Sequence, residues 1–233
     1  KYIQKNNDKK QLNKEVKNNI LQKIDKWEYA QSLNGYNGLI IKNFDKRIDA
    51  FNILTKMQKA GITPDIITYN CLIDMSFRNN QSENGIRLFE EICDPFSGVQ
   101  PDIVTYNIII KKYVGEIKEF ANNKNATPEE KLMKINKILK EIKGKDIKLN
   151  EITYNTVIDA YVEVGDFEKT WALFSEMKEN NLIPDSYTYA TLIKGLKVCG
   201  LKDGVEKAIS ILDLIKSGIC PDIQVDEVLY NSV

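Results

Sequence analysis

Residues 152–185 read ITYNTVIDAYVEVGDFEKTWALFSEMKENNLIPD, and this stretch predicts two helices joined by a short turn. Its first half carries apolar residues three or four positions apart, which lie on one face of a helix: Tyr154, Ile158 and Tyr161. Gly165 and Asp166 then interrupt the pattern. A second apolar stripe follows, made of Phe167, Thr170, Leu173, Phe174 and Met177. Pro184 ends the second helix, because proline cannot continue one.

The same landmarks recur along the chain. A tyrosine followed by asparagine, or once by alanine, occurs at six positions: Tyr36, Tyr69, Tyr106, Tyr154, Tyr189 and Tyr230. Three full copies of the surrounding motif read ITYNCLID, VTYNIIIK and ITYNTVID. Four residues before a tyrosine stands an aspartate or, once, an asparagine: Asp65, Asp102, Asn150 and Asp185. A motif that returns at this spacing is the signature of a repeat protein.

Each unit is predicted to be a pair of helices with apolar faces that it cannot bury alone. Stacking of neighbouring units buries these faces, so the sequence predicts an all-α superhelical solenoid. The units are residues 33–65, 66–102, 103–150, 151–185 and 186–226, with the start of a sixth at 227–233. Residues 1–32 are expected to form an N-terminal helical segment, either a cap or a partial repeat.

The third unit is longer than the others, and we expect an inserted surface loop at about residues 115–127. Thr127-Pro128-Glu129-Glu130 has the features of a helix start: a capping threonine, proline in the first turn and glutamate three residues after the cap. The second helix of this unit is therefore expected to begin near Pro128.

Composition excludes several classes of function. The 33 basic and 33 acidic residues cancel, whereas a protein that tracks phosphates is usually basic. The chain has no histidine and its four cysteines form no Cys-x-x-Cys pair, so we expect no metal site and no cofactor. No apolar run approaches the ~18 residues that a membrane-spanning helix needs. Because clustered aspartates for a metal-dependent nuclease are also missing, we expect no enzyme.

Together these landmarks resemble the pentatricopeptide-repeat (PPR) family, in the P-type form of its repeat. The family consensus runs approximately V-V-T-Y-N-T-L-I-D, then E-A-x-x-L-F-x-E-M, then G-I-x-P-D, and residues 152–185 and 50–65 follow it closely. The resemblance covers residues 33–233 and implies a right-handed superhelical solenoid. Tetratricopeptide repeats have a similar length but a different consensus that is absent here, which disfavours a peptide-binding solenoid.

The resemblance also implies which residues would contact RNA. The family reads bases with the fifth and the last residue of each repeat, and the second residue packs against the base faces. The fifth residues are Asn37, Asn70, Asn107, Asn155 and Ala190. The last residues are Asp65, Asp102, Asn150, Asp185 and Asp226, with Asp222 as an alternative to Asp226. The second residues are Ile67, Val104, Ile152 and Tyr187, while Asn34 departs from the apolar preference in the first unit.

The chemistry of these residue types fits a role in base reading. An asparagine amide has both a donor and an acceptor, and a neighbouring carboxylate, which only accepts, can fix its direction. Uracil offers a donor and an acceptor that such an amide can match, whereas Asn150 in place of aspartate relaxes the choice to either pyrimidine. The family code then implies the target 5′-U-U-(C or U)-U-N-3′. Alternatively, the asparagine caps a helix and the aspartate ends a turn.

The leading functional hypothesis is sequence-specific binding of single-stranded RNA, about one base per repeat. The family implies a mitochondrion or plastid and a role in RNA stability, processing or translation. Alternatives are an RNA- and protein-binding subunit of an organellar ribosome, or the repeat part of a protein-only ribonuclease P. Candidate phosphate contacts are Lys42, Arg78, Lys111 and Lys112.

Overall fold

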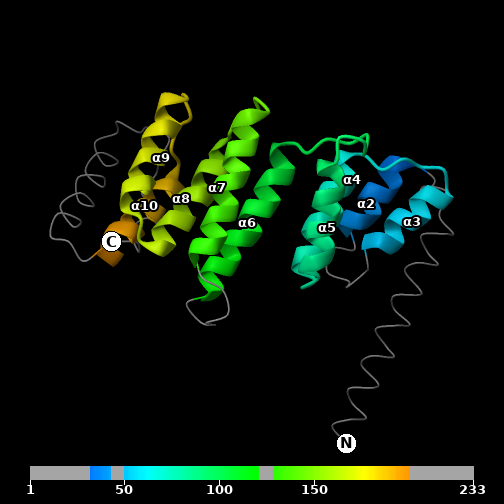
Figure 1. Cartoon of the computed structure of the whole chain (residues 1–233), viewed down its shortest axis with the longest axis horizontal. Helices are drawn as coiled ribbons and strands as arrows, with labels where there is room; N and C mark the ends of the chain where they lie inside the picture. Colours follow the sequence, from blue (N-terminus) through cyan, green and yellow to red (C-terminus); the bar gives the residue numbers. More distant parts are fainter. Residues whose placement is uncertain (1–31, 43–49, 121–127, 200–233) are drawn as a thin grey trace, which may run out of the picture. The chain divides into compact units, whose positions relative to one another are not determined.

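The computed structural model describes residues 32–42, 50–120 and 128–199, and these residues contain nine α-helices and no strand (Figure 1). The all-α class predicted from the sequence is confirmed. The helices are α2 (Leu33–Lys42), α3 (Ala50–Lys59), α4 (Ile66–Arg78), α5 (Ser82–Cys93), α6 (Ile103–Phe120), α7 (Pro128–Gly144), α8 (Glu151–Val164), α9 (Phe167–Glu179) and α10 (Ser186–Cys199).

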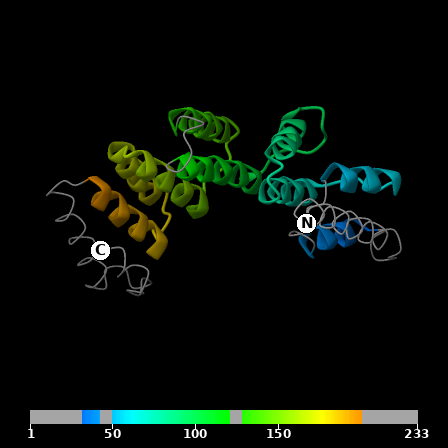
Figure 2. The same cartoon turned by 90° about the horizontal axis from the view of Figure 1, so that it is seen from below.

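The chain divides into two compact units, Lys1–Ile108 and Ile109–Val233, with the boundary inside α6. In the first unit α4 packs against α2, α3 and α5, and in the second α8 packs against α7, α9 and α10. Figures 1 and 2 show α4 beside α5 and α8 beside α9, each pair joined by a short turn. The first helix of a repeat therefore contacts both its own partner and the first helix of a neighbouring repeat.

Short polar side chains begin the first helices of the repeats. Asp65 caps α4 by accepting the backbone N–H of Thr68 at 2.8 Å. The hydroxyl of Thr68 accepts the backbone N–H of Asp65 in turn, which completes a capping box. Asn150 caps α8 in the same position, with Oδ1 3.0 Å from the backbone nitrogen of Thr153. Gly165 ends α8 with φ of 76°, a left-handed conformation that glycine adopts without steric strain.

The tyrosines of the repeated motif belong to the core. Five are buried: Tyr36, Tyr69, Tyr106, Tyr154 and Tyr189. Two of their hydroxyls also connect the helices of one repeat. Tyr69 donates to Glu91 at 2.7 Å, and Tyr154 accepts from the amide of Asn180 at 2.9 Å. Burial, with the charge of Glu176 nearby, raises the pKa of Tyr154 to about 12. This tyrosine is therefore neutral at physiological pH and serves packing.

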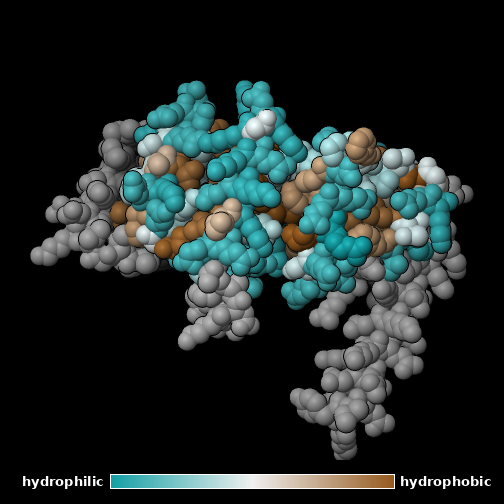
Figure 3. Space-filling model, viewed as in Figure 1, coloured by the Kyte–Doolittle hydropathy of each residue, from teal (hydrophilic) through white to brown (hydrophobic). Residues whose placement is uncertain are grey.

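The second helices carry apolar stripes that pack against the core. In α9, Thr170 and Met177 are buried, and Phe167, Leu173 and Phe174 are half-buried. In α3 the whole stripe is buried and consists of Ala50, Ile53, Leu54 and Met57. In the second unit Ile158, Val162 and Leu192 form a core against which Trp171, Leu173 and Phe174 of α9 pack. Hydrophilic residues cover most of the outer helix surfaces on the face shown in Figure 3, with hydrophobic residues visible between them.

The third repeat differs from the expectation in one respect. Residues 115–120, which were expected to begin an inserted loop, continue α6 through Phe120. Ile117 is buried, and Glu116 accepts ion pairs from Lys112 at 3.4 Å and from Lys131 of α7 at 2.6 Å. Burial and the pairing of charges four residues apart favour the helix here over a loop. The helix predicted to begin near Pro128 does begin there as α7.

Several expectations concern residues outside the described part of the chain. These are the N-terminal helical segment up to residue 31, the inserted stretch 121–127, and the chain from residue 200 onward. The second helix of the fifth repeat and the start of the sixth fall in the last of these ranges, so they stay predictions.

Candidate nucleic-acid interface

Three clusters of asparagine, aspartate and threonine recur with nearly the same geometry. In each cluster the asparagine lies within the first helix of one repeat, and the aspartate precedes the first helix of the next. The asparagine Nδ2 donates to the aspartate Oδ1 at 3.2 Å for Asn37–Asp65, 3.1 Å for Asn70–Asp102 and 3.2 Å for Asn155–Asp185. The structure therefore brings together three of the five residue pairs selected from the sequence.

A threonine completes each cluster, at the third position of the helix that the aspartate precedes. Its hydroxyl donates to the asparagine Oδ1 at 2.7 Å for Thr68–Asn37, 2.6 Å for Thr105–Asn70 and 2.6 Å for Thr188–Asn155. The backbone N–H of the same threonine donates to the aspartate Oδ1 at 2.8 Å in all three clusters. One carboxylate oxygen thus both caps a helix and binds the asparagine of the preceding repeat.

The clusters lie mostly below the surface. The three threonines are fully buried, and the asparagines expose only 7% to 8% of their area. A primary amide has two N–H donors and an oxygen with two lone pairs. Within each cluster one donor and one lone pair are used, so one N–H and one lone pair stay available to a ligand. That pair of groups can meet the edge of a base.

The carboxylate of Asp65 is charged at neutral pH. Burial acts to raise its pKa, but hydrogen bonds from the backbone and hydroxyl of Thr68 and from Asn37 outweigh burial and lower the pKa below 3.8. A lowered pKa in the folded state stabilises the fold above the unfolded-state value, and this contribution is lost only as the pH falls through the lowered one. The amide of Asn37 therefore faces an anionic acceptor throughout the physiological range.

Apolar side chains stand exposed beside these clusters. Ile67, Val104, Ile152 and Tyr187, the predicted second residues, are all large hydrophobics that expose between 49% and 63% of their area. Each lies three residues before a fifth residue, and positions i and i+3 share one face of a helix. Core packing does not explain side chains as exposed as these. An apolar contact surface therefore adjoins the Asn70 and Asn155 amides.

The second unit contains an open cavity of about 450 Å³ at one cluster. Its lining includes Ile152 and Asn155 of α8, Tyr187 of α10, and Lys111 and Lys118 of α6. A volume of this size falls in the range of small-molecule sites in proteins. The cavity thus combines an asparagine amide, two exposed hydrophobic side chains, two lysines and the carboxylate of Asp159.

Polar contacts hold Tyr187 at the cavity. Its hydroxyl donates to Oδ2 of Asp159 at 3.4 Å, and the ammonium group of Lys118 pairs with the same oxygen. Asp159 is buried, so its charge is compensated within the protein by Lys118. The buried carboxylate anchors the tyrosine ring at the edge of the cavity.

The remaining predicted site residues have different positions. Asn107 is half-buried in α6, and Asn150 caps α8; they belong to different compact units, so their pairing stays a prediction. Ala190 is buried in α10, while its expected partner Asp226, like the alternative Asp222, lies outside the described residues. Asn34 is exposed in α2.

The alternative structural interpretation does not hold as stated, although the aspartates do have a structural role. Asp65, Asp102 and Asp185 do accept the N–H three residues later, although they begin the next helix rather than end a turn. Their asparagine partners are not caps, because each lies within its helix. Sequence reasoning missed the threonines, although Asp-x-x-Thr precedes three of the tyrosines and is a recognisable capping pattern.

The candidate phosphate contacts have mixed environments. Arg78 pairs with Asp74 at 3.1 Å and Lys112 with Glu116 at 3.4 Å, so both cations have acidic partners on their own helices. Lys111 lines the cavity. The side chain of Lys42 lies outside the described part. Lys111 is therefore the strongest of the four candidates.

Among residues 32–42, 50–120 and 128–199, no group of three or more potential metal ligands is close enough to hold an ion. Within these ranges, no helix has both the length and the apolar character needed to cross a bilayer.

Comparison with protein families identifies the repeat. The family described as "PPR repeat family" matches residues 64–115 and 149–197, and the "Pentatricopeptide repeat domain" matches residues 19–79. Together the matches cover more than half of the chain. All residues of the three clusters lie within these matched segments.

Curated relatives carry the same repeat. A pentatricopeptide repeat-containing protein of Arabidopsis thaliana is 37% identical over 81 residues, which are 35% of this chain and 14% of the relative. A chloroplastic one from the same plant is 26% identical over 163 residues, 68% of this chain and 19% of the relative. The mitochondrial 15S rRNA processing factor CCM1 of Yarrowia lipolytica is 35% identical over 75 residues, 32% of this chain and 9% of the relative. The chain thus spans a small part of each relative's length.

Solved structures share the fold. The pentatricopeptide repeat protein PPR10 from maize superposes with a TM-score of 0.64 and 22% identity, over 92% of this chain and 28% of that one. The complex of PPR10 with an 18-nucleotide psaJ RNA element superposes with a TM-score of 0.61 and 20% identity, over 88% of this chain and 27% of that one. The PPR domain of Arabidopsis thaliana protein-only RNase P 1, in complex with tRNA, superposes with a TM-score of 0.58 and 17% identity. The superposition covers 84% of this chain and 95% of that one.

Proposed function

The chain belongs to the pentatricopeptide-repeat family, and from this premise we propose that it binds single-stranded RNA and reads about one base per repeat. The observation that carries the proposal is the recurring cluster in which a nearly buried asparagine amide is fixed by an aspartate. In two of the three clusters, an exposed apolar residue precedes that asparagine by three positions.

The cavity at Asn155 indicates how one base would be held. Ile152 and Tyr187 both line the cavity and would pack against the faces of a base, and such stacking tolerates any base. Selectivity would come from the amide of Asn155, which lines the cavity and keeps one N–H and one oxygen lone pair beyond its contacts with Asp185 and Thr188. Uracil has an acceptor at O4 and a donor at N3, which this pair of groups can satisfy together.

The register of the target follows from the family code. Asn–Asp pairs in the first, second and fourth repeats select uracil, and Asn107 with Asn150 selects either pyrimidine. The fifth repeat, with Ala190, has no hydrogen-bonding side chain at the fifth position. The proposed target is 5′-U-U-(C or U)-U-N-3′, with the first repeat at the 5′ base. P-type repeats, with one base for each, are part of the same proposal.

The biological setting is proposed from the relatives. One curated relative is named chloroplastic and another is a mitochondrial rRNA processing factor. We place the chain in the matrix of mitochondria or the stroma of plastids, where it would act in RNA stability, processing or translation. We also propose that these 233 residues bind RNA and do not catalyse a reaction.

Competition binding with the full chain tests the proposal. A fluorescently labelled RNA carrying UUCUU between unstructured flanks competes against the same RNA with AAAAA in its place, and against its perfect duplex. We expect the single-stranded pyrimidine RNA to bind tightest, because bases must be unstacked to reach the amides. Equal or tighter binding of the duplex contradicts single-strand reading, and equal binding of the adenine RNA contradicts base selection.

A further inference from the structure

We propose that Thr68, Thr105 and Thr188 set the base preference of the repeat that precedes each of them. The inference rests on the proposed function and adds a third residue to each reading pair. These threonines are fully buried, so they are positioning residues that act through the asparagine and do not touch the base. Each holds the amide of the preceding repeat in one of its two orientations.

The hydrogen bonds at the hydroxyl indicate where its proton lies. Thr105 Oγ1 accepts the backbone N–H of Asp102 at 3.1 Å, and Thr188 Oγ1 accepts that of Asp185 at 3.1 Å. The hydroxyl proton is then left to donate. The asparagine Oδ1 is nearer than the aspartate Oδ1 in both clusters, at 2.6 Å against 2.9 Å for Thr105 and 2.6 Å against 2.7 Å for Thr188. The two distances are equal, at 2.7 Å, for Thr68.

The aspartate has less need of that proton. Oδ1 of Asp185 already accepts the N–H of Thr188 at 2.8 Å and the amide of Asn155 at 3.2 Å. Within the described part of the chain, the hydroxyl of Thr188 is the one donor to the amide oxygen of Asn155, a buried residue. Leaving such an oxygen without a donor is unfavourable. The hydroxyl proton therefore belongs on the asparagine oxygen.

A flipped amide fits the cluster poorly. Oδ1 would then face the carboxylate oxygen of Asp185 at the distance now bridged by a proton, so that two acceptors would oppose each other. The hydroxyl of Thr188 could turn its proton toward the aspartate, but the amide oxygen would have lost its donor. The carboxylate of Asp185 disfavours the flipped amide, and the hydroxyl of Thr188 stabilises the observed one. Both residues therefore fix the amide orientation.

Amide orientation distinguishes the two pyrimidines. Uracil carries an acceptor at position 4 and a donor at position 3, and cytosine carries a donor at position 4 and an acceptor at position 3. For a base held in one pose, an N–H directed at position 4 selects uracil and an oxygen directed there selects cytosine. An amide free to turn would accept both bases.

The contact crosses from one repeat to the next. Thr188 lies in α10, in the repeat that carries Ala190, but its hydroxyl contacts Asn155 in α8. A substitution at Thr188 should therefore change the preference at the base read by Asn155 and leave the base at Ala190 unaffected. If the threonine had only a local or structural role, its substitution would not change the preference at the base of the preceding repeat alone.

Thr188→Val, Thr188→Ser and Thr170→Val test this inference in the full chain. Valine keeps the shape without the hydroxyl, and serine keeps the hydroxyl. Thr170→Val is the matched control, because Thr170 is equally buried and its hydroxyl bonds only the backbone oxygen of Asp166, at 2.9 Å. Competition binding uses RNAs that carry U or C at one position, and circular dichroism checks the helical content of each variant.

We expect Thr188→Val to lower the preference for U over C at the Asn155 position by about threefold to tenfold, the effect of one neutral hydrogen bond. Thr188→Ser and Thr170→Val should keep the wild-type preference. An unchanged ratio in Thr188→Val, or equal weakening for U and C RNAs, overturns the inference. If Thr188→Val does not fold, Thr105→Val carries the same test at the base read by Asn70.

Wild-type behaviour separates the two claims. A wild-type chain that prefers U at the Asn155 position, together with a Thr188→Val chain of identical preference, contradicts only the role of the threonine. A wild-type chain with no preference at any position contradicts the proposed function, and the inference with it.

Discussion

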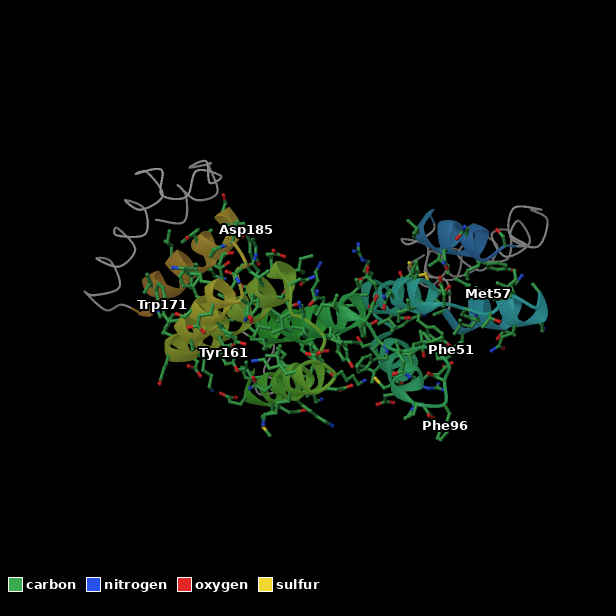
Figure 4. All side chains as sticks on the ribbon, turned by 90° about the horizontal axis from the view of Figure 1, so that it is seen from above. Phe51, Met57, Phe96, Tyr161, Trp171 and Asp185 are labelled. Carbon is green, nitrogen blue, oxygen red and sulfur yellow. The ribbon has the colours of Figure 1, made fainter. Side chains whose placement is uncertain are left out.

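At the scale of single residues, one carboxylate oxygen both caps a helix and holds an amide of the preceding repeat. Oδ1 of Asp185, a residue labelled in Figure 4, accepts the backbone N–H of Thr188 and so caps α10. The same oxygen accepts an N–H of the Asn155 amide. Asn150 occupies the equivalent position before α8 and caps it at 3.0 Å without a charge. Capping therefore needs only a side-chain oxygen, whereas fixing the neighbouring amide benefits from a group that cannot donate.

Asp185→Asn separates these two roles. Because asparagine and aspartate are about equally good caps, we expect thermal stability to change little. The preference for U over C at the Asn155 position should fall by about tenfold, since the new amide can donate or accept and a charge-assisted bond is lost. Asp166→Asn is the matched control: Asp166 caps α9 through Lys169 at 3.1 Å and contacts none of the predicted reading residues. A large loss of stability with unchanged selectivity would show that Asp185 serves only as a cap.

Tyr187 allows the apolar contact to be tested separately from base reading. Tyr187→Ala should weaken RNA binding by about 1–3 kcal/mol, the value of one aromatic–base stack, with little change in base preference. Tyr187→Phe should bind nearly as the wild type. Phe96→Ala removes an aromatic ring that is almost fully exposed in the loop after α5 and serves as the control (Figure 4). Equal binding by the wild type and Tyr187→Ala in a titration would exclude the ring from the interface.

The sequence predicted the asparagines and aspartates of the clusters but not the threonines. The Asn–Asp pairs could be read from their register in the repeats. The hydroxyl contact of Thr188 reaches a residue 33 positions away, so no local pattern shows it. The exposure of Ile67, Val104, Ile152 and Tyr187 likewise follows from which helix face is covered, which depends on packing.

At the scale of helices, small residues let the two helices of a repeat approach closely. Gly85 begins the buried stripe of α5, and a Cβ atom added there would lie 2.5 Å from the ring of Phe77 in α4. The sequence shows the glycine but not the side chain that it faces. The ring that requires it became visible only in the structure.

Gly85→Ala should therefore destabilise the chain. Alanine gains about 1 kcal/mol in helix propensity, but overpacking a buried contact costs about 1–3 kcal/mol. We expect a net loss of about 1 kcal/mol in urea unfolding. In contrast, Gly38→Ala in α2 should be stabilising, because Gly38 is exposed and a Cβ atom there meets nothing within 4 Å. A stabilised Gly85→Ala chain would mean that the ring of Phe77 can move aside at little cost.

Helix boundaries could be predicted where capping residues mark them and not where packing decides. Pro128 and Gly165 were recognised from their chemistry, and both lie at the expected helix ends. The loop expected from about residue 115 was wrong for residues 115–120, because it was placed from the extra length of the third unit and not from the residues themselves. The buried Ile117 and the Lys112–Glu116 pair, four residues apart, favour continuation of α6.

At the scale of the whole molecule, acidic and basic residues balance and many are paired. Lys143 pairs with Glu176 at 2.6 Å, Lys131 with Glu116 at 2.6 Å, and Lys118 with Asp159. Cations paired in this way are less available to phosphates. The proposed RNA binding would therefore depend on contacts with bases more than on contacts with the phosphate backbone.

Salt dependence measures this property. We expect the logarithm of the RNA-binding constant to fall linearly with the logarithm of the salt concentration. Each phosphate contact should add about −0.7 to the slope, and we expect only a few such contacts. Lys111→Gln, at the cavity, should reduce the slope by about one such increment, whereas Arg78→Gln, whose cation pairs with Asp74, should leave it nearly unchanged. A slope as steep as that of a strongly basic nucleic-acid binder would show that phosphate contacts dominate.

Base selection by a single asparagine is the central claim, and Asn155→Thr with Asp185 retained tests it most directly. Threonine is shorter, leaves room for a purine and keeps a hydroxyl that can donate or accept. Competition binding with RNAs that differ only at the base read by the fourth repeat should show a shift from U toward G, with a change of about 1–3 kcal/mol in relative affinity. The preferences at the other positions should be unaffected. Equal weakening of all RNAs would show that Asn155 is structural, and an unchanged preference would contradict the register or RNA reading itself.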